Sequence, residues 1–198
     1  MKTGLIFMAA IILLPAYCLG DSGADFIIKC GFVDDFHHPG LRLPINNFER
    51  QNLAGGQFYF SQPMIFDLII GVDLFRQERV YSLEGQKINL RMRDMAVTAS
   101  LVIPIKFSTL DLFVGAGCGT HSLAFDYVRP RDLSLTSNGM VIPEVSTYFG
   151  YHAIAGMKYD LPGLPVGVYA ESKFNRVNLP AEDIEYKSFA IGLFLSLP

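Results

Sequence analysis

Acidic, basic and histidine side chains recur at alternate positions of segments whose other positions are apolar. A carboxylate and an amine on one face of such a segment can exchange a proton, as in an acid–base site or a proton path. In an apolar interior, however, an unpaired charge is costly, so the same residues are expected to neutralise one another as salt bridges. We interpret the set as a buried ion-pair network and keep proton transfer as the alternative. Its members are Lys29, Asp67, Asp73, Asp94, Asp111, His121, His152, Lys158, Glu171 and Lys173.

The segment 110–127, LDLFVGAGCGTHSLAFDY, indicates which element positions such residues. Read with a period of two, one face is apolar from Leu110 to Cys118, and the other carries Asp111, three glycines and His121. Glycine is unfavourable inside a helix, so the segment is predicted to be a strand. The second face is polar and small but almost uncharged, unlike the solvent face of a soluble sheet. The pattern predicts a narrow transmembrane β-barrel, with the apolar face toward lipid and the glycine face toward a crowded lumen.

Seven further segments show the same alternation, which predicts an all-β, eight-stranded antiparallel up-and-down barrel. Most segments reach the roughly 9–11 residues that a tilted strand needs to cross a bilayer. Their connections alternate between short turns and longer loops, as in outer-membrane barrels, and a medium loop is expected at 82–87. The long connections 34–53 and 128–143 are expected outside the cell. The predicted strands are 24–33, 55–61, 64–80, 89–106, 110–127, 144–160, 164–177 and 186–197.

The N-terminus is predicted to be a secretory signal peptide. Lys2 precedes an apolar run over 5–14, and small residues follow before Asp21, with cleavage expected after Gly20. The run is too short to span a bilayer as a retained helix. Lipoprotein processing at Cys18 is the alternative, although Tyr17 stands where a small residue is expected. Residues 1–20 are therefore assigned to the signal peptide and 21–198 to the barrel domain.

The amino-acid composition favours a membrane barrel over a nucleic-acid-binding protein or a soluble carrier. Of 198 residues, 51% are hydrophobic and only 18% are charged, and the net charge of −3 gives no reason to expect a nucleic-acid partner. A secreted lipocalin-like carrier is the soluble alternative, an up-and-down barrel that is apolar inside. Its outer faces would need dense charge, whereas the polar faces here are mostly small and neutral. The chain also has no tryptophan, whereas lipocalins usually carry one near the start of the barrel sequence.

Several chemistries are not expected. The glycine-rich run 115–120 does not have phosphate-loop spacing and no helix follows it, so no nucleotide cofactor is predicted. His37 and His38 have no ligand cluster around them, so no metal site is predicted. Cys30 and Cys118 lie on strands expected on opposite sides of the barrel, and a disulfide needs Cα atoms within about 7 Å. Both are predicted to be free thiols facing lipid.

Three stretches carry a family resemblance: LFVGAG at 112–117 after a tight turn, AGMKY at 155–159, and the alternating terminal segment 189–197. With them, the chain resembles the small eight-stranded outer-membrane barrels of Gram-negative bacteria, which include the OmpA membrane domain, OmpX, OmpW and lipid A deacylases. Such barrels usually end in an aromatic residue, whereas this chain ends Leu197-Pro198.

The resemblance implies an outer-membrane location, contact with outer-membrane lipid and handling by the barrel insertion machinery. The alternation and the asymmetry of the loops together predict a non-enzymatic protein with a structural, adhesive or surface-interaction role, in which any surface partner binds through 34–53 and 128–143. An eight-stranded barrel is only wide enough for side chains to fill it, so a diffusion channel is not expected.

The deacylases in this group suggest the enzymatic alternative, a lipid A-modifying acyl hydrolase. They use a histidine, a serine and a carboxylate, for which His121 and Ser122 are the weak catalytic candidates here. Adjacent residues of a strand point to opposite faces, so this pair would need a β-bulge. The apolar phase switches near Leu123, which gives such a bulge a place. The prediction remains a protein that is not an enzyme.

Overall fold

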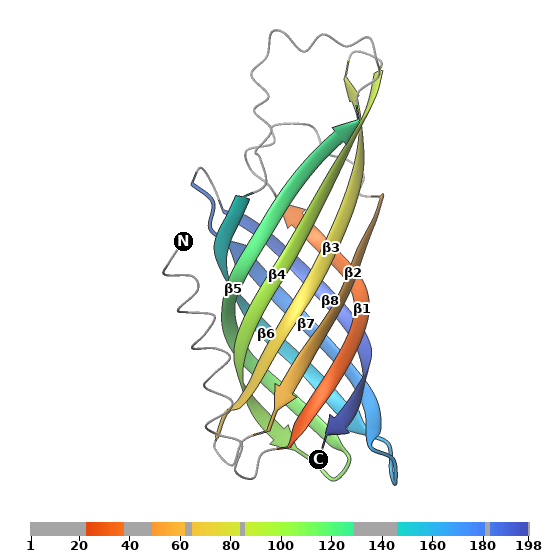
Figure 1. The fold of residues 1–198 in the computed structure, drawn as a ribbon, viewed down its shortest axis with the longest axis vertical. Helices are drawn as coiled ribbons and strands as arrows, with labels where there is room; N and C mark the ends of the chain where they lie inside the picture. Colours follow the sequence, from red (N-terminus) through yellow and green to blue (C-terminus); the bar gives the residue numbers. More distant parts are fainter. Residues whose placement is uncertain are drawn as a thin grey trace.

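The structure, a computed structural model, describes residues 23–37, 49–61, 65–83, 86–128, 146–180 and 183–197. Each strand pairs antiparallel with the next, and β8 pairs with β1 to close the barrel (Figure 1). This confirms the predicted fold class, while the predicted signal peptide 1–20 lies outside the described residues. The strands are β1 (Ala24–His37), β2 (Glu49–Phe60), β3 (Asp67–Leu83), β4 (Gln86–Lys106), β5 (Leu110–Val128), β6 (Ser146–Asp160), β7 (Val166–Val177) and β8 (Ile184–Leu197).

Two predicted loops are shorter than expected. The prediction of a medium loop at 82–87 is wrong, because β3 continues to Leu83, which pairs with Gln86 at the start of β4. The strands also extend into the predicted loop 34–53, since β1 runs to His37 and β2 begins at Glu49. Backbone pairing does not need an apolar face once a strand has left the lipid, so hydrophobic alternation cannot mark these ends.

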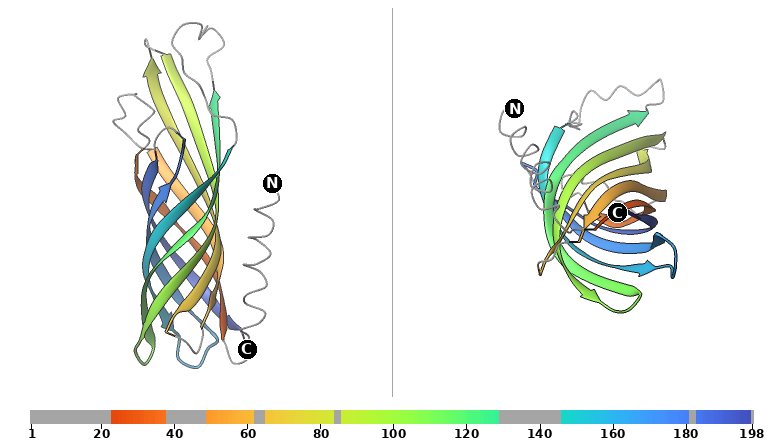
Figure 2. Two further views of the ribbon diagram at one scale, coloured as in Figure 1. Left: turned by 90° about the vertical axis from the view of Figure 1, so that its left-hand side faces the viewer. Right: turned by 60° about the horizontal axis from the view of Figure 1, so that its bottom comes forward.

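Strands β3 to β5 project well beyond the rest of the barrel. β4 has 21 residues and β7 has 12, which correspond to roughly 70 Å and 40 Å at about 3.3 Å per residue. Both views of the ribbon show these strands rising past their neighbours at the end opposite the C-terminus (Figures 1 and 2). The end of β5 at Val128 therefore lies well above the ends of the shorter strands, and only the hairpin of β3 and β4 extends further.

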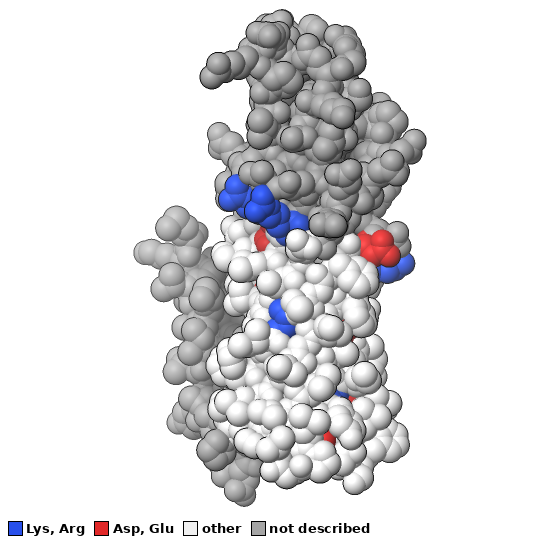
Figure 3. All heavy atoms as spheres, turned by 90° about the vertical axis from the view of Figure 1, so that its right-hand side faces the viewer, with Lys and Arg blue, Asp and Glu red and all other residues white. Residues whose placement is uncertain are grey.

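The polarity of the barrel is the reverse of that of a soluble protein. Leu193 and Ile28 on the outer wall are 66% and 63% exposed, whereas Lys173 inside is 2% exposed. The face drawn in Figure 3 is almost free of charged atoms over its wall, and most of those it shows gather at the upper edge. Such a wall is stabilised by contact with lipid rather than water, so the strands are those of a membrane-spanning barrel.

The interior is filled by side chains in two apolar clusters. The first cluster lies toward the projecting end and the second toward the short turns, as their positions along the strands show. In the second cluster the Phe113 ring centroid lies 5.8 Å from that of Tyr59 and 5.7 Å from that of Tyr169. The first contains Val33, Leu53, Phe75, Leu123, Val177, Ile184, Tyr186 and Ala190; the second contains Ile27, Tyr59, Ile69, Val102, Phe113, Ile154, Tyr169 and Phe194.

Strand β5 alternates without interruption through His121 and Ser122, the pair that only a β-bulge would bring to one face. The ladders with β4 and β6 keep their register across His121 and Ser122. Leu123 is 1% exposed and belongs to the first apolar cluster. From Leu123 onward the apolar residues of β5 face the lumen because the lumen itself is apolar at this level. The strand does not bulge there.

The two cysteines of the described chain are both free. Cys30 is exposed on β1 and Cys118 is partly exposed on β5. Both occupy outward positions of the alternation, where the predicted barrel meets lipid. Within the described ranges no helix is long and apolar enough to cross a membrane. The same ranges hold no group of three or more potential metal ligands.

Candidate functional site

The centre of the lumen holds four charged side chains, which we call the charged quartet: Lys29, Asp73, Glu171 and Lys173. The Lys29 Nζ lies 2.5 Å from the Glu171 Oε1 and 2.8 Å from the Asp73 Oδ1. The Lys173 Nζ lies 2.8 Å from the Asp73 Oδ2 and 3.4 Å from the Glu171 Oε1. Two cations thus face two anions, and the group is neutral as a unit.

A glycine allows part of the charged quartet to form. Lys29, Gly55 and Asp73 stand in register on β1, β2 and β3, so Lys29 must reach Asp73 across β2. A Cβ at Gly55 would lie 2.9 Å from the Lys29 Cε, closer than non-bonded atoms approach. The absent side chain is therefore a condition for this ion pair.

Neutral side chains satisfy the remaining hydrogen-bonding groups of Glu171. The Tyr169 hydroxyl donates to the Glu171 Oε2 at 2.6 Å, and the Gln57 Nε2 donates to the same oxygen at 3.3 Å. The Gln57 Oε1 accepts a 2.7 Å bond from the Lys29 Nζ. Buried charges need such partners, so the quartet is held in one geometry.

The charged quartet lies between the two apolar clusters. Along β1, Lys29 follows Ile27 of the second cluster and precedes Val33 of the first. Along β7, Glu171 and Lys173 lie between Tyr169 and Val177 in the same way. This layering separates the charges from water at both ends, and it fits a filled lumen better than an aqueous path.

A second polar group lies near the short turns. Lys158 pairs with Asp25, whose Oδ1 also accepts a 2.8 Å hydrogen bond from the Ser196 hydroxyl. The Lys158 Nζ lies 4.4 Å from the centroid of the Tyr59 ring, and the Tyr59 hydroxyl donates to the Asp67 Oδ2 at 2.8 Å. The group thus joins β1, β2, β3, β6 and β8. Asp111, the remaining predicted member at this end, is only partly buried.

The upper lumen holds both predicted histidines. The His121 Nδ1 lies 2.9 Å from the Asp94 Oδ2, which also accepts a 3.2 Å bond from the Tyr186 hydroxyl. The His152 Nε2 lies 2.7 Å from the Ser100 Oγ. Among the residues that the structure describes, the His152 Nδ1 has no hydrogen-bond partner. The structure therefore places nine of the ten predicted residues in buried positions of the lumen.

The two weak catalytic candidates are not brought together. His121 is 1% exposed and faces the lumen, whereas Ser122 faces outward, with its Oγ 3.3 Å from the Thr147 Oγ1. The serine that does contact a histidine is Ser100, which is 2% exposed and paired with His152. A buried serine of this kind has no access to an acyl chain in the surrounding lipid.

Several side chains that contact the predicted luminal residues were not among the predictions, although they occupy inward positions of the same alternation. Asp25 and Gln57 occupy the same inward alternation as Lys29 and Tyr59, but sequence alone does not say which inward polar groups meet. Ser100 and His152 are 52 positions apart and approach only because β4, β5 and β6 are neighbours in the barrel.

Replacing Ser122 by alanine is expected to leave the lipid A of an expressing Gram-negative host unchanged, and to alter the free energy of unfolding by less than about 1 kcal/mol, the size of one exposed hydrogen bond. Mass spectrometry of lipid A from cells with wild type, Ser122→Ala and empty vector checks this. Loss of an acyl chain with wild type but not with Ser122→Ala would contradict it.

Comparisons with known proteins agree on the fold. No family model matches the sequence, and no curated protein matches it significantly. Among solved structures, the chain is similar to the outer membrane protein OprG from Pseudomonas aeruginosa, with 16% identity, a TM-score of 0.52 and coverage of 88% of this chain and 96% of that one. It is also similar to Neisserial surface protein A, with 11% identity, a TM-score of 0.51 and coverage of 88% and 94%. The chain therefore has the fold of the small outer-membrane barrels.

Proposed function

We propose that this chain is a non-enzymatic outer-membrane barrel, held in lipid by its wall and acting at the cell surface through its external connections. The observation that carries the proposal is the inverted polarity of the barrel, in which exposed leucine and isoleucine side chains surround a neutral, buried charged quartet. A wall of that kind needs lipid outside, and an interior of that kind is a plug rather than a pore.

The surface role falls to the connections at the projecting end. Segments 34–53 and 128–143 leave from this end, opposite the short turns and the C-terminus (Figure 2). The long ladder of β3, β4 and β5 raises the start of the second connection at Val128. A partner outside the cell would approach the barrel at this end, where the hairpin of β3 and β4 extends furthest. The insertion machinery and the lipids of the outer membrane are the other partners of this proposal.

The two alternatives have less support. A lipid A-modifying hydrolase would need a lipid-facing serine beside a histidine, and His121 and Ser122 face opposite sides of β5. A soluble carrier would need room inside and charge outside. The two apolar clusters and the charged quartet fill the lumen, and the outer wall is apolar.

Cell fractionation with gel mobility tests the proposal. The full chain is expected in the outer membrane and to migrate differently before and after boiling, because a folded barrel resists the detergent used for the gel. A second chain, with 38–48 and 129–145 replaced by short Gly/Ser linkers, is expected to keep the mobility shift and lose adhesion to host or abiotic surfaces. A soluble periplasmic protein without a heat-dependent shift would refute the membrane barrel, and adhesion unchanged by the linkers would refute the surface role.

A further inference from the structure

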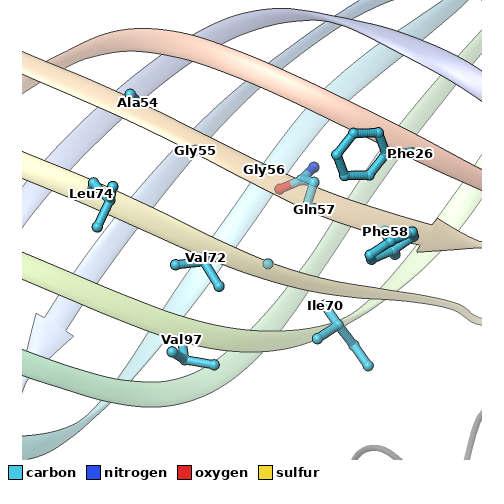
Figure 4. Close-up of a pocket in the computed structure, with 11 residues that line it drawn as sticks. Phe26, Ala54, Gly55, Gly56, Gln57, Phe58, Ile70, Val72, Leu74 and Val97 are labelled. Carbon is cyan, nitrogen blue, oxygen red and sulfur yellow. The ribbon is translucent and has the colours of Figure 1, made fainter.

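The outer wall has an apolar groove of about 550 Å³ over β1, β2, β3 and β4 (Figure 4). Phe26 and Phe58 bound it at one end and Leu74 at the other, with Val72 and Val97 along its side. These side chains come from outward positions, so the groove opens on the wall that contacts lipid. From Ile70 to Leu74 it follows β3 for about 13 Å at the usual rise per residue.

The groove exists because one outward position lacks a side chain. Gly56 stands in register between two large apolar residues, Ile28 on β1 and Val72 on β3. A Cβ at Gly56 would meet nothing closer than the Ile27 carbonyl oxygen at 3.7 Å. Close packing inside the barrel therefore does not require glycine at this position. The missing side chain instead leaves a slot in the wall.

Two arginines stand just beyond the upper end of the groove. Arg76 and Arg93 are directly opposite each other in the β3–β4 ladder, and both are exposed. Arg76 follows the lining residue Leu74 by two positions on the same face, a separation of about 7 Å. Guanidinium groups form bidentate hydrogen bonds with phosphate oxygens, so two adjacent ones favour an anionic phosphate group.

We propose that the groove and the two arginines together bind one anionic, phosphate-bearing lipid of the outer leaflet, with an acyl chain along Gly56 and the phosphate at Arg76 and Arg93. The inference rests on the proposed function, because it requires this wall to lie in lipid with its projecting end outward. The site is apolar along the wall and cationic at its upper edge. Such a lipid has the same arrangement, with an apolar tail below and an anionic head group above.

Lipid retention tests the site directly. The full chain is inserted into vesicles of phosphatidylcholine and phosphatidylglycerol, extracted into mild detergent and examined by native mass spectrometry. Wild type is expected to retain one phosphatidylglycerol in preference to phosphatidylcholine. Arg76→Gln with Arg93→Gln is expected to lower that affinity roughly thirty-fold, at about 1 kcal/mol for each cation near a head group. Gly56→Leu is expected to remove retention by filling the slot.

Matched variants on the far wall control for charge and bulk. Arg176→Gln with Lys187→Gln removes two cations from β7 and β8, and Ala153→Leu places a leucine side chain on the outer face of β6, as Gly56→Leu does on β2. Both are expected to retain the lipid as wild type does. Equal retention of the two lipids, retention unaffected by the arginine and Gly56 variants, or a lipid-free dimer would overturn the inference. A chain that inserts and shows the heat-dependent shift but retains no lipid refutes only the inference, whereas a chain that does not insert refutes the proposed function as well.

Discussion

Replacing Lys29 by methionine is expected to lower the free energy of unfolding by about 3–5 kcal/mol, the cost of leaving a buried charge without its partner. Lys29 contacts both carboxylates of the charged quartet, and its removal leaves Asp73 and Glu171 to share Lys173. Methionine keeps the length and apolar stem of the side chain, so the loss reports charge rather than volume. Urea unfolding of the barrel in vesicles, followed by gel mobility, measures it.

A second substitution separates charge balance from simple damage. Glu171→Gln added to Lys29→Met leaves one cation and one anion, Lys173 and Asp73, whose Nζ and Oδ2 are 2.8 Å apart. The double variant is expected to recover most of the lost stability, because the interior is neutral again. Lys106→Met, at an exposed position of β4, is the control and is expected to change little. Additive losses in the double variant would contradict the role of the quartet as one neutral unit.

Replacing Leu101 by arginine is expected to destabilise the barrel by about 2–4 kcal/mol, as a cation on the lipid face does near the bilayer midplane. Leu101 is 58% exposed on β4, so a protein surrounded by water would tolerate the change. The cost comes from bringing a guanidinium group into hydrocarbon. The same unfolding measurement, with protein inserted in vesicles, gives the value.

The same substitution at a position near the edge of the bilayer is the control for this prediction. Phe107 lies in the short turn after β4, at the lower edge of the wall, and is 56% exposed. Phe107→Arg is expected to cost only about 0–1 kcal/mol, because a long cationic side chain there reaches the interface. Equal, small effects of Leu101→Arg and Phe107→Arg would indicate a wall in water and support the soluble carrier.

Much of the fold can be predicted from the sequence, because lipid and lumen impose opposite demands on adjacent residues. Strand β7 illustrates this: Val168, Ala170 and Phe174 face out while Glu171 and Lys173 face in, and the pattern has one solution. The ends of β3 and β4 could not be found in this way. Outside the lipid their pairing depends on backbone hydrogen bonds, which leave no alternation in residue type.

For the charged quartet, the sequence predicts which side chains face the lumen but not which of them pair. Alternation shows that Lys29 and Glu171 face the lumen, yet their contact depends on barrel closure across 142 positions of sequence. The Ser100–His152 contact instead depends on β4, β5 and β6 being neighbours, which residue types along the chain do not show. At Leu123 the residue types alone are compatible with a bulge, because an apolar residue on the luminal face resembles a change of register. The apolar cluster above the charges explains it instead.

The division of the charged quartet between strands bears on how the barrel assembles. Lys29 and Asp73 belong to the first three strands and contact each other, while Glu171 and Lys173 contact each other along a single later strand. Each half is thus electrically balanced before the two halves meet. Within the charged quartet, closure of the sheet therefore joins two ion pairs that are each already neutral, and bringing them together adds no net charge to this part of the interior.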